Sequence, residues 1–99
     1  MDDPDTTFDS VFEKTVELGN RHAQKHQDAD LWDIADGMLA GAIQYWLYAH
    51  QPCGDPRCEE CATVSTAEGR VAEMQRMIRQ FTEESEYYHS PTDLNVGRA

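Results

Sequence analysis

The sequence predicts an all-α protein of three helices, arranged as an antiparallel bundle-like domain with a cysteine-rich loop between the second and third helices. Three observations support this. Apolar residues recur at three- and four-residue spacing in three segments, no segment has the alternation of a strand, and all three cysteines lie in one short stretch between two of these segments. With 99 residues, the chain has the length of one small domain, which we place at 1–99, with an acidic lead at 1–5 and a flexible tail at 90–99.

The first helix is expected from Thr6 to His26, with Asp5 as its N-cap. Its apolar positions recur at helical spacing and share one face, as listed here: Phe8, Val11, Phe12, Thr15, Leu18 and Gly19.

The second helix is expected from Leu31 to His50, capped by Asp28 or Asp30. Apolar residues extend nearly all round it, and such a helix must be covered on several sides. We therefore expect a homodimer or another protein partner along this helix. The contact would use its aromatic residues Trp32, Tyr45, Trp46 and Tyr48.

The third helix is expected to begin at the segment "STAE" and to run to about Tyr87. Ser65 followed by Glu68 has the spacing of a capping box, in which each side chain bonds a free backbone amide of the other residue. The predicted inner face contains Ala67, Val71, Met74, Ile78 and Phe81, followed by Ser85 or Tyr88.

The stretch "HQPCGDPRCEEC" has the spacing H-x2-C-x4-C-x2-C. Zinc prefers four sulfur or nitrogen ligands in a tetrahedron, and short loops supply such sets. We predict a structural zinc site formed by Cys53, Cys58, Cys61 and His50. Reserve candidates for the fourth ligand are His22, His26 and His89. Such a site would join the second and third helices and stabilise a small core.

Other uses of the cysteines stay open. The C-x4-C-x2-C spacing resembles part of the plant-type ferredoxin cluster loop, but that cluster needs a distant fourth cysteine, which this chain lacks. A redox disulfide between Cys58 and Cys61 or between Cys53 and Cys58 is a second alternative, although the βαβ context of thioredoxin-like proteins is missing. Reduced, inert thiols are the third.

The sequence favours a protein without enzymatic activity. The cytidine-deaminase pattern needs an H-x-E motif, and "HQPC" does not supply it. Glu86 and His89 have the E-x-x-H spacing of di-iron helical bundles, but the second copy that such sites need is missing. A small metalloenzyme using Glu59 or Glu60 beside the metal is therefore kept as an alternative that ranks behind the non-catalytic readings.

The net charge of −11, from 19 acids and 8 bases, argues against nucleic-acid binding through a basic surface. Only two of the bases, Lys14 and Lys25, are lysines, and acid excess with scarce lysine is typical of proteins from a high-salt cytoplasm. Neither a secretory signal nor a membrane span is evident, so we expect a cytoplasmic protein.

These observations together predict a small acidic, zinc-stapled helical protein that acts as a protein-interaction or regulatory module. The alternatives are a metal- or redox-responsive regulator and an acidic inhibitor that imitates nucleic acid.

Overall fold

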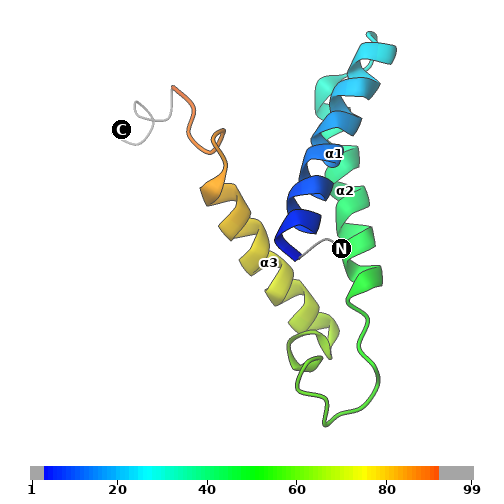
Figure 1. Cartoon of the computed structure of the whole chain (residues 1–99), viewed down its shortest axis with the longest axis vertical. Coiled ribbons are helices and arrows are strands. Elements are labelled where there is room, and N and C mark those ends of the chain that lie inside the picture. The colour runs from blue at the N-terminus through cyan, green and yellow to red at the C-terminus, as the bar shows by residue number, and fades with distance from the viewer. Residues whose placement is uncertain (1–3, 92–99) are drawn as a thin grey trace. The chain divides into compact units, whose positions relative to one another are not determined.

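The computed structural model describes residues 4–91 and confirms the all-helical prediction. The described residues contain three α-helices, one short 3-10 helix and no strand: α1 (Pro4–Lys25), α2 (Leu31–Ala49), η1 (Ala62–Val64) and α3 (Ala67–Glu84) (Figure 1). The cysteines lie in the loop between α2 and α3, as predicted. The chain divides into two compact units, a hairpin unit (Met1–Ala49) and a loop–α3 unit (His50–Ala99). The single domain at 1–99 stays a prediction.

Helix α1 begins at Pro4, two residues before the predicted start, so the prediction that Asp5 is the N-cap was wrong. Proline suits the first position of a helix, because the amide hydrogen that it lacks would have no intrahelical partner there. The rest of the predicted acidic lead, residues 1–3, lies outside the described residues, as does most of the predicted tail, residues 92–99.

Helix α2 has the predicted start, and Asp30 rather than Asp28 caps it. The carboxylate Oδ1 of Asp30 accepts a hydrogen bond of 3.0 Å from the backbone N–H of Trp32. The backbone carbonyl of Asp30 accepts one of 3.1 Å from the backbone N–H of Ile34. A side-chain acceptor at this position satisfies one of the amides that a helix leaves free at its N-terminus.

Helices α1 and α2 form an antiparallel hairpin, joined by residues 26–30 (Figure 1). The two helices approach closely at Gly19, where an added Cβ would lie 2.6 Å from the Sδ atom of Met38 and 3.9 Å from Ile34. The absence of a side chain at Gly19 therefore lets the thioether of Met38 lie directly against the α1 backbone.

Helix α3 is capped by Thr66, one residue after the predicted cap, Ser65. The Oγ1 atom of Thr66 accepts a hydrogen bond of 2.9 Å from the N–H of Gly69, and the backbone of Thr66 is extended, as an N-cap requires. Ser65 instead donates its hydroxyl hydrogen to the carbonyl of Ala62, at 3.1 Å. The capping box with Glu68 was therefore wrong, and the helix ends at Glu84, three residues before the predicted Tyr87.

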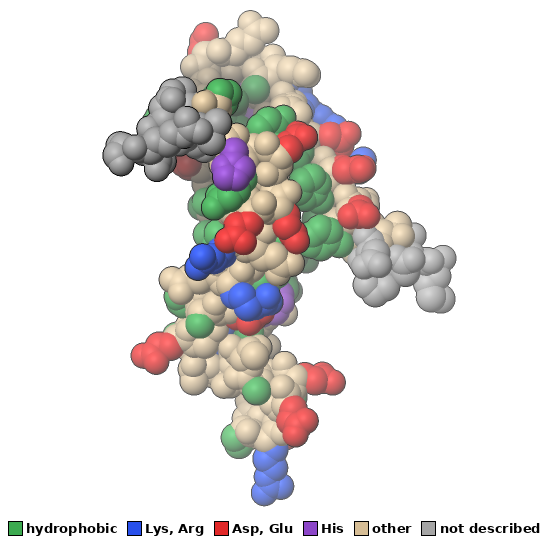
Figure 2. Space-filling model, turned by 90° about the vertical axis from the view of Figure 1, so that its left-hand side faces the viewer, with side chains coloured by type: hydrophobic (Ala, Val, Ile, Leu, Met, Phe, Trp, Pro, Cys, Tyr) green, Lys and Arg blue, Asp and Glu red, His purple; other side chains and the backbone are tan. Residues whose placement is uncertain are grey.

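Few side chains of the described residues are buried. Among the residues whose side chains the structure describes, Val64 is the one buried hydrophobic residue, with 7% of its surface exposed. On the predicted inner face of α3, Met74 is half-buried, whereas Val71 is 53% exposed and Phe81 40%. Figure 2 shows hydrophobic side chains at the surface among acidic and basic ones. A chain with so little buried apolar surface needs another source of stability.

Candidate metal centre

The loop turns sharply between Cys53 and Cys58. Gly54 has a φ angle of +90°, which residues with a Cβ rarely adopt. Asp55 then opens a turn in which its carbonyl accepts a bond of 3.1 Å from the N–H of Cys58, and its carboxylate accepts one of 2.9 Å from Arg57. Pro56 occupies the second position of this turn, where its fixed φ angle fits. The four residues between these two cysteines thus reverse the chain.

A second turn leads from Cys58 to Cys61. The carbonyl of Glu59 accepts a hydrogen bond of 3.2 Å from the N–H of Ala62. Cys61 then precedes η1, and its carbonyl accepts a bond of 3.0 Å from Val64. Cys61 is therefore fixed at the start of a short helix that the sequence analysis did not predict.

Element η1 is held against the start of α3. The buried side chain of Val64 lies at this contact, and the guanidinium of Arg70 donates a hydrogen bond of 3.0 Å from Nη1 to the carbonyl of Val64. Gly69 permits the close approach, because an added Cβ would lie 2.8 Å from the carbonyl oxygen of Thr63. Neither Arg70 nor Gly69 was predicted to support the site. The sequence feature that could have indicated this support is a glycine in the first turn of α3 that is immediately followed by an arginine.

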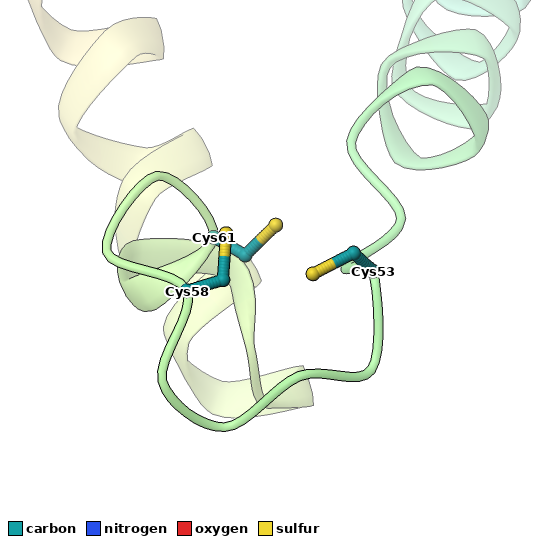
Figure 3. Close-up of side chains that lie close together, drawn as sticks. All are labelled: Cys53, Cys58 and Cys61. Carbon is teal, nitrogen blue, oxygen red and sulfur yellow. The ribbon is translucent and has the colours of Figure 1, made fainter.

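The structure brings Cys53, Cys58 and Cys61 together. Their three Sγ atoms all lie within 4.8 Å of one another, and none of these thiols is in a disulfide. Cys53 is exposed and the other two are half-buried. In Figure 3, Cys53 approaches from the opposite side of the loop to Cys58 and Cys61, and its sulfur atom points toward that of Cys61.

This spacing suits a metal ion after a small contraction. Zinc–sulfur bonds of about 2.3 Å in a tetrahedron place neighbouring sulfur atoms about 3.8 Å apart. The thiols would therefore move together by up to about an ångström on binding such an ion. The donor set is all sulfur, which favours zinc and other thiophilic ions over magnesium or calcium. Three close cysteines can thus hold a metal ion.

Backbone amides near the thiols favour ionisation at one of them. The pKa of Cys58 is lowered, first by a hydrogen bond with the backbone amide of Cys61, and then by bonds with the thiols of Cys61 and Cys53 and with the amide of Glu60. Amides two and three residues after a cysteine thus stabilise its thiolate. A thiolate is the form that binds a metal.

The pKa of Cys61 shifts in the opposite direction to that of Cys58. At Cys61, a hydrogen bond with the backbone of Cys53 lowers the pKa, but hydrogen bonds with the thiols of Cys58 and Cys53 act against it. Burial and the charge of Cys53 add to these, so that the pKa of Cys61 is raised. The opposite directions of these two pKa shifts favour ionisation at Cys58 over Cys61.

His50 does not belong to the group of three sulfur atoms. It lies just after α2, and its charge contributes to lowering the pKa of Glu73 on α3. The largest cause of that lowered pKa is a hydrogen bond from Arg76, which also carries the ion pair with Glu73. His50 as the fourth ligand stays a prediction.

The reserve histidines lie in two different units. His22 and His26 are in the hairpin unit, one helical turn apart, with ring centroids 4.5 Å from each other. His89 is in the loop–α3 unit, and its ring lies 4.6 Å from that of Tyr88. Their role as reserve ligands stays a prediction.

No family model, curated protein or solved structure matches this chain. Within residues 4–91, none of the helices combines the length and the apolar character that crossing a membrane requires.

Proposed function

We propose that this protein is a non-catalytic interaction module whose loop is held in shape by one zinc ion. Cys53, Cys58 and Cys61 would supply three thiolates, and His50 is the predicted fourth ligand. The observation that carries the proposal is the convergence of the three thiols within 4.8 Å, on turns that the backbone hydrogen bonds already define.

A structural role for the ion follows from the surroundings of the site. The cysteines connect the end of α2 to η1, and η1 contacts α3 around the buried Val64. In a chain with little buried apolar surface, a metal–thiolate centre supplies folding free energy that packing does not. The exposed apolar side chains would then be available to a partner.

The proposal is tested by the stability of the metal-loaded protein with and without a chelator. We expect the Cys58→Ser variant to lose the metal ion and to unfold at a lower temperature, because zinc binding is part of folding in such sites. The matched control is Ser65→Ala, which removes one hydroxyl between η1 and α3 and leaves the three thiols in place. A chelator that leaves the melting temperature unchanged would argue against a structural ion.

A metal- or redox-responsive regulator is the second candidate. It is favoured by the exposure of Cys53 and by a group of three rather than four converging ligands among residues 4–91, both of which ease loss of the ion. Two thiols that lose the metal can be oxidised by hydrogen peroxide to one disulfide, and the peroxide is reduced to two water molecules. Weak zinc binding, with release that changes the helical content of the protein, would favour this candidate over a permanent staple.

A further inference from the structure

Two histidines lie side by side at the end of α1, in the hairpin unit rather than in the cysteine loop. The rings of His22 and His26 have their centroids 4.5 Å apart and their planes tilted by 39°. Both side chains are exposed. Neutral imidazole is the commonest metal ligand among side chains, so this pair offers two nitrogen donors that an ion in solution can reach.

The backbone holds the two histidines one turn apart. The N–H of His26 donates a hydrogen bond of 2.9 Å to the carbonyl of His22, which is the bond between residues four apart in an α-helix. The carbonyl of His26 accepts a further bond of 2.9 Å from the N–H of Ala29. Residues four apart on a helix share one face. The two imidazoles are therefore presented together by the helix itself.

The distance between the rings indicates the coordination geometry that the pair fits. A metal–nitrogen bond of about 2.0–2.1 Å, with about 1.1 Å more from the nitrogen to the ring centre, places each centroid about 3.2 Å from a shared ion. Two such ligands at a right angle have centroids about 4.5 Å apart, whereas two tetrahedral ligands have centroids about 5.2 Å apart. The observed 4.5 Å matches the right angle. Rotation of each exposed ring about its Cβ–Cγ bond can aim one nitrogen at the ion.

The donor atoms and this angle indicate which ions the pair would bind. Ligands at right angles are typical of the tetragonal sites of copper(II) and nickel(II), and structural zinc is tetrahedral. Imidazole suits both of these ions, which lie toward the strong-binding end of the first-row divalent series. The thiolates of the loop are softer ligands. The chain thus contains two donor sets with different preferences.

The charges around the pair act in both directions. The last turn of α1 carries the partial negative charge of its free carbonyls, which attracts a cation. Arg21 and Lys25 are each adjacent in sequence to one of the histidines, and their charges oppose binding. Adjacent residues on a helix point about 100° apart, and both of these basic side chains are exposed, so water screens their repulsion.

We propose that His22 and His26 form a second metal site, which binds one copper- or nickel-like divalent ion through two imidazole nitrogens, with water in the remaining positions. This inference goes beyond the proposed function and uses none of the cysteines. The unfolded chain does not hold the two imidazoles together, so an ion at this site stabilises the last turn of α1.

The test is a titration of the full chain with nickel(II), from roughly 1 µM to 1 mM, in the presence of one equivalent of zinc. NMR follows the side chains of the four histidines, because paramagnetic nickel broadens the signals of nuclei close to it. We expect the signals of His22 and His26 to broaden together, before those of His50 and His89. His50 borders the cysteine loop, so its signal reports nickel that binds the thiols instead.

A matched pair of variants tests the two-histidine site directly. His22→Gln removes one imidazole and keeps a polar side chain. It should weaken nickel binding by at least about tenfold in calorimetry, because the second nitrogen no longer binds as part of a chelate. His89→Gln is the control, because the ring of His89 lies 4.6 Å from that of Tyr88, which is not an imidazole. Circular dichroism shows whether both variants keep their helices.

The absence of broadening at the highest nickel concentration would overturn the proposal. So would broadening that begins at His50, broadening that is equal at all four histidines, or an affinity that the two variants lower equally. Zinc content is measured on the same samples, and His22→Gln should keep its zinc. Loss of zinc in that variant would assign the histidine to the cysteine centre and overturn the second site. Absence of zinc from every sample would count against the proposed function alone.

Discussion

Gly69 lies where η1 meets the start of α3, directly after the cysteine loop. Its missing side chain lets η1 lie against α3, with the carbonyl of Thr63 in the space that a Cβ would take. A backbone oxygen cannot move aside as the end of a flexible side chain can. The position is therefore sensitive to the smallest possible substitution.

We predict that Gly69→Ala destabilises the protein by about 1–3 kcal/mol, the usual cost of overpacking. Gly41→Ala on α2 is the control, because an added Cβ there meets nothing within 4 Å. Alanine should stabilise that helix by about 0.8–1 kcal/mol over glycine. Chemical denaturation of both variants measures the difference. Equal effects of the two substitutions would contradict the close contact at Gly69.

The N-cap of α3 gives a second prediction for single residues. Thr66→Ala should cost about 1 kcal/mol, because the N–H of Gly69 loses its side-chain acceptor. Ser65→Ala should cost less, since the Ser65 hydroxyl donates to the carbonyl of Ala62, at the start of η1, instead. Thermal unfolding of the two variants separates them, and a larger loss at Ser65 would restore the capping box predicted from the sequence.

At the scale of elements, α3 carries an electrostatic pair that depends on pH. Arg76 lowers the pKa of Glu73, with a smaller contribution from His50. A lowered pKa in the folded state means that the pair stabilises the protein above the pKa of the unfolded chain, about 4.3 for a glutamate. This stabilisation is lost as the pH falls through the lowered value.

We predict that Arg76→Gln returns the pKa of Glu73 toward its ordinary value, as followed by NMR titration of the side-chain carboxyl carbon. Arg79→Gln is the matched control, because Arg79 pairs with Glu83 instead, at 3.1 Å. An unchanged pKa of Glu73 in the Arg76→Gln variant would show that the hydrogen bond is not its main cause.

The elements also show what a sequence can predict. Helical periodicity located all three helices, because apolar spacing reflects the geometry of the helix itself. The periodicity misplaced the start of α1, which begins at a proline that suits the first position of a helix. It also misplaced the start of α3, where local hydrogen bonds decide whether Ser65 or Thr66 is the N-cap.

The candidate site was predictable in part, because its three cysteines are close together in the sequence. Spacing alone grouped Cys53, Cys58 and Cys61, because short turns bring nearby residues together. The support from Gly69 and Arg70 depends on the packing of η1 against α3, and apolar periodicity does not encode that contact. His50 matched the ligand spacing, but the sulfur group forms without it.

At the scale of the whole molecule, a net charge of −11 means that the acidic side chains repel one another. We predict that added salt raises the free energy of unfolding, because salt screens this repulsion. Urea denaturation at low and at high concentrations of sodium chloride measures the change, and a free energy of unfolding that falls with added salt would contradict the prediction.

The central claim is that Cys53, Cys58 and Cys61 bind one metal ion. Elemental analysis of protein purified without added metal tests it most directly, with the thiols counted on the same sample. The account predicts about one zinc ion per chain and three thiols that resist alkylation while the ion is bound. When a chelator removes the ion, the three thiols should become reactive. Protein that folds with no bound metal and three freely reactive thiols would contradict it.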